Sequence, residues 1–563
     1  MTTMTRDDAL ARLTSPGEPY ELATRTIKDR SLKVFVNAPD SLRELFAEAA
    51  SDATFLVYEN ERLSFAETQR QAAQIAHLLM EQYGIGKGDR VAISMRNYPE
   101  WVTAFMAATS IGAIAVAMNA LWQAEEMHYG LEDCGARVLF ADQERLDRLA
   151  QCAPLPDLDV IAVRPTQLPA GVPDLAELLA VRTETEMPDV RVDPEDAATI
   201  FYTSGSTGHP KGVVSSHRNI LSALFSWELD LAANALATGV TAPPLAQQAA
   251  TLLAVPLFHA TGSHAVYLQS YRAQRKMVSM YRWDPEVAAT LIERERITSV
   301  TAPAAMTGDL IRVARATQRD LSSLLTVGGG GAPRAPEQVR QIESAFGQAL
   351  PNTGWGMTET NAIGTGIGGL DYLEHPASSG RRSAVLELRV VDEQGRTLPA
   401  GERGELLIRG TSMFQGYWNR PEVNAEVFVD GDWFRTGDVA YLDDEGYLYI
   451  VDRIKDLIIR GGENIGCGQV EAALLMHPHV HEAAVYAVPD ERLGEEVGAT
   501  VYGSAELDVD ALRAFLHEHL ARFEVPRYIH VSPEPLPRTA SGKILKRQLR
   551  DDVAASLAPV ATA

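Results

Sequence analysis

One short loop, rich in glycine and hydroxyl side chains, restricts what this chain can fold into more than any other segment. It runs from Tyr202 to Gly212 with the sequence Tyr-Thr-Ser-Gly-Ser-Thr-Gly-His-Pro-Lys-Gly and follows the apolar run Ala197–Phe201. Small residues let a backbone turn tightly enough to point several N–H groups at one phosphate, and a lysine adds positive charge for the same anion. The phosphate-binding candidates are Thr203, Ser204, Gly205, Ser206, Thr207, Gly208 and Lys211.

Two other interpretations of this loop follow from the same residues. A turn of glycine and serine is more often a flexible connector than a phosphate site. The ordered alternation of hydroxyls and glycines before Pro-Lys-Gly nevertheless favours the phosphate site. The loop is not a Walker A motif, because Pro210 stands where that motif has glycine and no serine or threonine follows Lys211.

The pattern of the chain changes twice, which indicates several domains. At 563 residues the chain exceeds the usual size of one hydrophobic core. Apolar runs alternate with amphipathic helical stretches over roughly the first 430 residues, a pattern typical of α/β units around a buried sheet. From Leu386 the strands are short and rich in turn signals, which favours a small β-barrel. The sequence therefore predicts an α/β fold. A large domain at 1–451 would contain two α/β subdomains and the β-barrel. A charged hinge at 452–456 would connect it to a small α+β domain at 457–563.

Composition and charge argue against several classes of function. The formal net charge of -24 disfavours general binding to nucleic acid or anionic membranes, since both reward basic surfaces. The three cysteines are scattered and fit no disulfide or zinc pattern, so a cytoplasmic protein is expected. No signal peptide is predicted at the N-terminus. The uncharged segment Trp101–Ala124 is long enough to cross a bilayer, but its polar residues and Gly112 favour a buried helix followed by a strand, so no membrane span is expected.

A glycine-rich motif with an aromatic residue and a carboxylate is a second candidate site. The motif at 352–359 reads Asn-Thr-Gly-Trp-Gly-Met-Thr-Glu. Glycines let the backbone approach a flat ligand, an aromatic face can stack on a base, and a carboxylate suits the Mg²⁺ that accompanies a triphosphate. A glycine-rich turn with a core tryptophan is the alternative. The candidates are Thr353, Gly354, Trp355, Gly356, Thr358 and Glu359.

Three single residues, Asp438, Lys543 and His259, are further candidates for ligand binding or catalysis. Asp438 ends a strand-like Phe-Arg-Thr-Gly-Asp, where a carboxylate suits two hydrogen bonds to ribose hydroxyls, although a solvated turn aspartate would look the same. Lys543 lies on a turn near the C-terminus, where most lysines are merely solvated. His259 follows an apolar strand, and a core histidine is the more common interpretation there.

Three further segments give weaker signals. The glycine run at 328–333 and the charged cluster at 452–465 indicate little by themselves. Three histidines lie at 477–481, but Pro478 breaks the helical spacing between them. We therefore do not expect a metal ion at these histidines.

Together these motifs resemble the signature of the adenylate-forming enzymes, the superfamily that includes acyl-CoA synthetases, peptide-synthetase adenylation domains and luciferases. Six motifs occur in the order of that family between Tyr202 and Lys543, and the resemblance covers nearly the whole chain. It implies ATP, Mg²⁺ and coenzyme A as ligands, and a C-terminal domain that is mobile.

On the nucleotide side, the resemblance implies a role for each motif. The glycine and hydroxyl loop with Lys211 would cradle pyrophosphate, Trp355 would stack against adenine, and Thr358 would contact the α-phosphate. Glu359 would hold Mg²⁺. Tyrosine is more common than tryptophan at position 355. The implied contacts to adenine, ribose and the acyl pocket are Thr353, Gly354, Gly356, Gly331, Ala332, Pro333, Asp438 and Arg453.

The resemblance also implies how the reaction is catalysed and divided. Lys543 would bridge the carboxylate and the α-phosphate, and His259 would line the carboxylate side, where the position of its ring gates the two half-reactions. Lys455 would be the pivot of a hinge at 452–456. Gly461–Gly462 would leave room for the pantetheine arm of CoA.

The implied reaction has two steps and three substrates. A carboxylate attacks the α-phosphorus of Mg·ATP to give acyl-AMP, and the CoA thiol then displaces AMP. The expected partners are therefore a small carboxylic acid, ATP and CoA, with a homodimer left open. A carrier-protein ligase, a luciferase-like oxygenase and a nucleotide-binding regulatory protein remain alternatives, and the presence of both Lys211 and Lys543 argues against the last.

The identity of the acid substrate is the least constrained part of this interpretation. The small, apolar residues at 301–306 and 363–366 favour a medium- or long-chain fatty acid, although an aryl acid would also fit an apolar pocket. Acetylation of Lys543 would remove its charge, so we expect it to stop adenylation and spare thioester formation.

Overall fold

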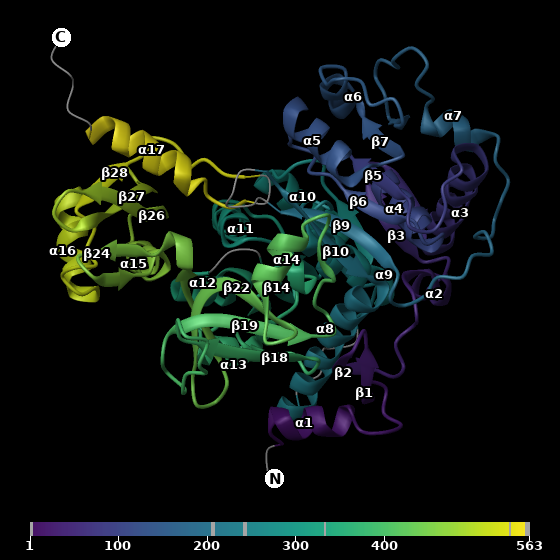
Figure 1. Cartoon of the computed structure of the whole chain (residues 1–563). Helices are drawn as coiled ribbons and strands as arrows, with labels where there is room; N and C mark the ends of the chain where they lie inside the picture. Colours follow the sequence, from purple (N-terminus) through teal and green to yellow (C-terminus); the bar gives the residue numbers. More distant parts are fainter. Residues whose placement is uncertain (1–3, 204–208, 240–244, 331–333, 540–541, 558–563) are drawn as a thin grey trace.

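Two large sheets form the centre of the N-terminal part of the protein, as the computed structural model shows (Figure 1). The structure describes residues 4–203, 209–239, 245–330, 334–539 and 542–557. The order of the first sheet is β20 (Gly416–Tyr417), β10 (Lys211–Ser216), β9 (Ala197–Thr203), β6 (Ile114–Ala117), β5 (Arg90–Ser94), β7 (Val138–Asp142) and β8 (Asp159–Val163). The order of the second is β17 (Arg381–Arg382), β16 (Thr365–Gly368), β15 (Leu350–Thr353), β14 (Thr326–Gly328), β13 (Ser299–Thr301), β11 (Ala250–Leu253), β12 (Lys276–Ser279), β3 (Thr54–Tyr58) and β4 (Glu61–Ser64).

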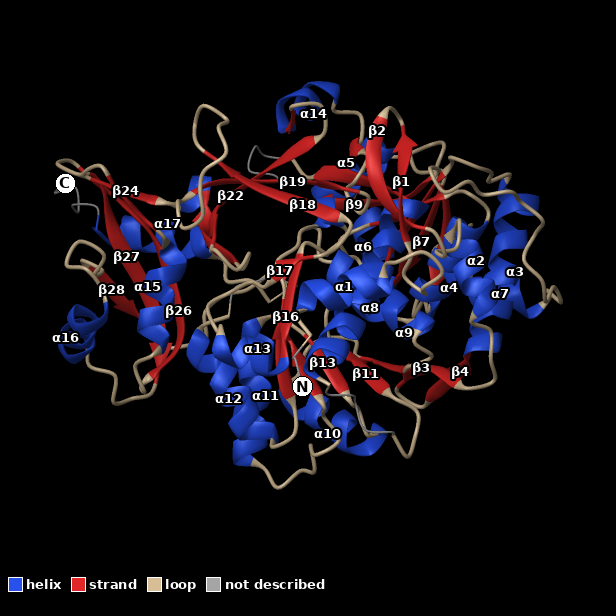
Figure 2. Cartoon of the chain, turned by 90° about the horizontal axis from the view of Figure 1, so that it is seen from below, coloured by secondary structure: helices blue, strands red, loops and turns tan. Residues whose placement is uncertain are grey.

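Helices pack around these sheets, as Figure 2 shows. They are α2 (Leu42–Glu48), α3 (Phe65–Tyr83), α4 (Pro99–Ser110), α5 (Ala124–Cys134), α6 (Gln143–Leu149), α7 (Leu175–Ala180), α8 (His217–Thr238), the π-helix η1 (Thr261–Leu268), α9 (Gln269–Arg272), α10 (Pro285–Glu295), α11 (Ala304–Ala316), α12 (Pro336–Phe346) and α13 (Gly369–Glu374). The central strands of both sheets pair in parallel, and the main core joins them through buried aromatic rings. These rings belong to Phe55, Phe65, Trp101, Phe105, Tyr267 and Tyr271.

The ends of helix α3 are set by local capping residues. Ser64 caps its first turn with Glu67 in a reciprocal capping box, and Gly84 ends the helix with a φ of 60°. Helix α4 is buried along almost its whole length and leads into the buried strand β6, which confirms the predicted helix and strand in the uncharged segment. In the described part of the chain, α8 alone is long and apolar enough to cross a membrane. It packs against α1 (Arg6–Leu13) and η1.

Two smaller sheets complete the chain. The region predicted to be a small β-barrel is an antiparallel sheet of β18 (Leu386–Val391), β19 (Gly404–Gly410), β21 (Phe428–Val429), β22 (Trp433–Leu442) and β23 (Leu448–Arg453), with α14 (Pro421–Val427) beside it. The C-terminal sheet contains β24 (Ile458–Arg460), β25 (Glu463–Ile465), β26 (Val480–Asp490), β27 (Gly494–Gly503) and β28 (Tyr528–Val531), with α15 (Cys467–Leu475), α16 (Val509–His519) and α17 (Lys546–Leu557). An N-terminal hairpin of β1 (Leu22–Ile27) and β2 (Arg30–Phe35) lies near α1 (Figure 1). The C-terminal elements lie to one side of the N-terminal part, connected by the single turn η3 (Ile454–Asp456).

A buried histidine at the start of α8 makes the stability of the fold depend on pH. The His217 ring is fully buried, and its Nδ1 accepts a hydrogen bond from the Leu42 N–H at 3.1 Å. Burial lowers the pKa of His217 from 6.5 to about 4. The unfolded chain therefore binds the proton first, so this stabilisation is complete above pH 6.5 and is lost as the pH falls toward 4.

We expect His217→Asn to destabilise the protein by about 1–2 kcal/mol at pH 8, because asparagine keeps an acceptor for Leu42 but packs less well. The difference from the unsubstituted protein should shrink between pH 6.5 and 4, since asparagine does not titrate. Urea midpoints at several pH values measure it, with the exposed His530→Asn as the control. A difference that stays constant down to pH 4 would contradict the assigned role of His217.

Candidate active site

A cavity of about 2820 Å³ lies between the N-terminal part and the C-terminal elements, and it collects most of the predicted site residues. Residues that follow the carboxyl ends of the parallel strands β11, β14 and β15 line it, where α/β sheets commonly bind ligands. The predicted residues in its wall are Thr203, Lys211, His259, Thr353, Gly354, Trp355, Gly356, Thr358, Glu359, Asp438, Arg453, Lys455 and Lys543.

Some predicted residues do not lie in this wall. Gly461 and Gly462 form the turn between β24 and β25, outside the cavity, and their φ values of 60° and 97° suit glycine. Ser204, Gly205, Ser206, Thr207, Gly208, Gly331, Ala332 and Pro333 lie outside the described residues.

The ends of the glycine and hydroxyl loop are held by two antiparallel strands. Thr203 at the end of β9 pairs with Lys211 at the start of β10, so the residues on either side of the loop lie on neighbouring strands. The Lys211 ammonium lies 5.3 Å from the centre of the Tyr417 ring, a cation–π distance. This contact fixes the direction in which the Lys211 side chain extends along the cavity wall.

Tyr417 connects this lysine to the predicted metal ligand. Its hydroxyl donates a hydrogen bond of 2.7 Å to Oε1 of Glu359. Glu359 is 5% exposed, and burial raises the pKa of its carboxyl group. Among the described residues, no lysine or arginine forms an ion pair with Glu359. A buried carboxylate that lines a cavity and has no ion-pair partner among the described residues fits a hard divalent cation such as Mg²⁺.

Asp438 is held between an indole and a guanidinium. Its Oδ2 accepts a hydrogen bond of 2.7 Å from Nε1 of Trp355, and its Oδ1 lies 2.6 Å from Nε of Arg453. Burial raises the pKa of Asp438, whereas the charge of Arg453 lowers it. The sequence predicted a strand that ends at this aspartate, which is wrong because β22 continues to Leu442. The strand bulges at Gly437, which has a φ of 72°, and the bulge redirects Asp438.

Glycines bring the Trp355 segment close to its neighbours. A Cβ atom on Gly356 would lie 2.6 Å from the Ala362 carbonyl oxygen, and one on Gly364 would lie 2.5 Å from the Trp355 ring. Asn361 and Ala362 follow with φ values of 57° and 64°, a left-handed conformation that asparagine adopts readily and alanine rarely. The short helix η2 (Thr358–Thr360) between these segments carries Thr358 and Glu359.

Lys543 reaches the cavity from the C-terminal elements. It follows Gly542, whose φ of 80° forms the turn, and a Cβ on that glycine would lie 3.3 Å from Pro303 of the N-terminal part. The Lys543 side chain is open to the water of the cavity yet surrounded by protein. Desolvation and the nearby Arg453 lower its pKa, and the carboxylates of Asp438 and Glu359 raise it. The turn therefore directs a cation toward the residues predicted to bind nucleotide.

His259 faces the same lysine. It lies directly before η1, and π-helical turns are frequent at functional sites. Burial, and secondarily the charge of Lys543, lowers the pKa of His259 to about 4. The imidazole is therefore neutral at pH 7 and can accept or donate one hydrogen bond without charge.

Two side chains of the site were not predicted from the sequence. Tyr417 comes from the two-residue strand β20, and a lone tyrosine in a turn gives no signal. Arg334 is 8% exposed and lines the cavity near the segment at 301–306 that was predicted to form a small, apolar wall. Pro303, Ala304 and Ala305 do lie in that wall, but a guanidinium group accompanies them.

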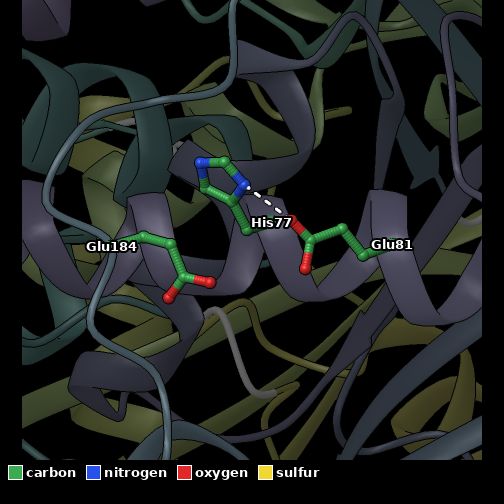
Figure 3. A group of neighbouring side chains, drawn as sticks. All are labelled: His77, Glu81 and Glu184. Carbon is green, nitrogen blue, oxygen red and sulfur yellow. Dashed lines mark hydrogen bonds and ion pairs between the residues drawn. The ribbon is translucent and has the colours of Figure 1, made fainter.

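The one group of possible metal ligands found among the described residues lies away from the cavity. His77 and Glu81 of α3 and Glu184 converge on the surface (Figure 3). Nη1 of Arg182 lies 3.2 Å from Glu81 and 2.9 Å from Glu184, so both carboxylates already have a cation. His477 instead packs on Phe515, and His479 contacts Ser504. We interpret the His77 group as a surface ion-pair network.

Comparison with known proteins gives a consistent result. The family model described as AMP-binding enzyme matches residues 44–418, and the model described as AMP-binding enzyme C-terminal domain matches residues 469–543. The feruloyl-CoA synthase of an Amycolatopsis species is 36% identical, covering 90% of this chain and 96% of its own. The long-chain-fatty-acid–CoA ligase FadD13 of Mycobacterium tuberculosis is 33% identical, covering 88% and 94%. The crystal structure of the anthranilate CoA ligase AuaEII with anthranoyl-AMP has a TM-score of 0.83 at 26% identity, covering 92% of this chain and 98% of that one.

Proposed function

As the chain belongs to the family of AMP-binding enzymes, we propose that it activates a medium- or long-chain carboxylic acid as acyl-AMP and transfers the acyl group to CoA. The family makes the protein an AMP-forming acid–thiol ligase. The names of the relatives include both fatty-acid and feruloyl substrates, so an aryl acid is the second candidate. The observation that best supports the proposal is Lys543, which enters the cavity beside Glu359, Asp438 and Arg453.

In the first step two anions must meet, and the cations of this site offset their repulsion. A carboxylate oxygen attacks the α-phosphorus, and the bond from that phosphorus to the β-phosphate oxygen breaks. Lys211 and the preceding loop hold the departing pyrophosphate. Lys543 lies between the carboxylate and the α-phosphate, which Thr358 also contacts. The neutral His259 lines the carboxylate side.

The nucleoside is held by the cluster around Asp438. This carboxylate and Arg453 contact the ribose, and the Trp355 face stacks on adenine while its N–H remains bound to Asp438. The hydrogen bond fixes the plane of the indole before the nucleotide arrives. A fixed ring loses little entropy on binding.

Glu359 would hold the Mg²⁺ of Mg·ATP. When bound, the ion would neutralise charge on the phosphates. The chain itself supplies a buried carboxylate that Tyr417 orients.

The second step requires another arrangement of the C-terminal domain, which we place at 457–563. Gly461 and Gly462 lie outside the cavity, whereas Lys543 lies inside it, as suits the first step. Rotation about Lys455 within 452–456 would withdraw Lys543 and bring the glycine turn toward the acyl-AMP. The thiol of CoA then attacks the acyl carbon and AMP leaves. A carrier-protein thiol is the alternative acceptor of the acyl group. The cytoplasmic location and the assembly state of the protein remain predictions.

Product analysis across a panel of acids tests this function. The full-length protein is incubated with Mg·ATP, CoA and one acid at a time. The acids are fatty acids from short to long chain and aryl acids of the benzoate and cinnamate types, and the products are identified by mass spectrometry. We expect acyl-CoA with an equal amount of AMP. Accumulation of acyl-AMP and pyrophosphate without thioester would favour a carrier-protein ligase, and an optimum with cinnamate types would favour the aryl acid.

A further inference from the structure

The described part of the chain contains two buried arginine side chains, and they differ in whether a carboxylate pairs with the guanidinium group. Arg145 is 1% exposed and forms ion pairs with Asp142 at 3.1 Å and Glu144 at 2.5 Å. Arg334 is 8% exposed, and no carboxylate among the described residues pairs with it. A buried guanidinium without a counter-charge is energetically unfavourable, so its presence calls for an explanation.

Polar but uncharged groups surround Arg334. Its Nη2 donates a hydrogen bond of 3.2 Å to Oγ1 of Thr307, whereas Nε and Nη1 have no partner in the described structure. A Cβ atom on Gly329 would lie 3.1 Å from Nη2 and 3.0 Å from Oγ1 of Thr353, so these two groups approach the same point. The one titratable neighbour that affects its pKa is Tyr372, whose hydroxyl is neutral near pH 7.

Arg334 borders the cavity of the candidate active site. Arg334 lines the cavity together with Thr353 and Gly329, and Pro303 and Ala304 of the same wall belong to the segment expected to contact the acid. Thr307 lies on α11 directly after that segment. The guanidinium therefore belongs to the wall of the acid pocket.

We propose that Arg334 binds a second carboxylate of the acid substrate, so that the preferred substrates are dicarboxylic acids. This inference rests on the proposed function and specifies its substrate. One carboxylate lies at Lys543 and is activated, and the other ends at Arg334, with Thr307 and Thr353 beside it. An acid that ends in a methyl group would leave the buried guanidinium unpaired, and such a mismatch discriminates strongly between substrates.

Matched acids provide the test. The full-length enzyme is assayed for AMP and acyl-CoA formation with α,ω-dicarboxylates of six to sixteen carbons, each compared with the monocarboxylate of equal length, and with terephthalate compared with benzoate. We expect kcat/KM for the best dicarboxylate to exceed that of its partner by about 100-fold. Equal values at every length would overturn the inference and leave the proposed function in place. Absence of AMP with every acid would overturn both.

Substitution of Arg334 separates a role in acid binding from a structural role. Arg334→Gln should lose the preference through a higher KM for the dicarboxylate, with the KM for ATP unchanged, and Arg334→Lys should restore part of it. Arg340→Gln is the matched control, because Arg340 is exposed on the adjoining helix α12 and pairs with Glu337. A change confined to the KM for ATP would assign Arg334 to the nucleotide and contradict the proposal.

Thermal unfolding gives a readout that does not depend on turnover. Without ligand, Arg334→Gln should melt at an equal or higher temperature than the unsubstituted protein, because an unpaired buried charge is removed. The best dicarboxylate should raise the melting temperature of the unsubstituted protein and not that of the variant. A variant that melts lower and still responds to the dicarboxylate would show that Arg334 is structural.

Discussion

Replacement of Lys543 by methionine should reduce the rate of acyl-AMP formation by about 10²–10³-fold and leave thioester formation from supplied acyl-AMP largely intact. The side chain enters the cavity on a turn of the C-terminal elements, close enough to Asp438, Glu359 and Arg453 for their charges to shift its pKa. In the proposed first step it would offset the repulsion between carboxylate and α-phosphate. In the proposed second step the C-terminal domain would have rotated, so the lysine would lie away from the reacting atoms.

The two half-reactions can be measured separately. Adenylation is followed by pyrophosphate release, and thioester formation by mixing acyl-AMP with CoA and quantifying acyl-CoA. Arg547→Gln, an exposed substitution on the adjoining helix α17, is the control. Acetylation of Lys543 should reproduce the methionine result because it also removes the charge. Equal losses in both half-reactions would show that Lys543 is not specific to adenylation.

The pH dependence of adenylation adds a second check on Lys543. The proposed role requires the ammonium form, and desolvation together with Arg453 lowers the pKa of Lys543 below 10.5. Adenylation should therefore decline with rising pH at a lower value than for an ordinary lysine. Thioester formation should not follow that decline.

Local sequence patterns were sufficient to predict several of the helices and strands. The bounds of α3 follow from apolar periodicity with a capping box and a terminal glycine, which act within a few residues. The largely apolar runs at 483–488 and 497–502 likewise lie within β26 and β27. The set of motifs indicated nucleotide binding because each motif contains residues with the chemistry that nucleotide binding needs.

The missed features depend on contacts between distant segments. Tyr417 is 58 residues from Glu359, and their hydrogen bond exists only because β20 pairs with β10. Arg334 would be expected on the surface from composition alone, and its burial depends on how α11 and α12 meet. The course of β22 past Asp438 depends on a bulge opposite β19. No local pattern contains this information.

Replacement of Glu359 by glutamine should reduce adenylation by about 10²–10³-fold, and Tyr417→Phe by about 10-fold. Glutamine has the size of glutamate and can still accept the Tyr417 hydrogen bond, so the larger loss would reflect the missing charge. Phenylalanine keeps the ring beneath Lys211 and removes only the hydroxyl that orients Glu359. Tyr83→Phe is the control, since Tyr83 is the last residue of α3 and does not line the cavity. Equal activity of Tyr417→Phe and the control would contradict the orienting role.

Stability measurements test the same carboxylate without turnover. Because burial raises the folded-state pKa of Glu359 above 4.5, its contribution to stability is present below pH 4.5 and lost as the pH rises through that pKa. Glutamine does not ionise, so ligand-free Glu359→Gln should melt at an equal or higher temperature at pH 7. Mg·ATP should raise the melting temperature of the unsubstituted protein more than that of the variant, and this difference should diminish as the pH falls and Glu359 becomes protonated. A cation site would thus be distinguished from a structural carboxylate, whose removal would lower the melting temperature with and without Mg·ATP.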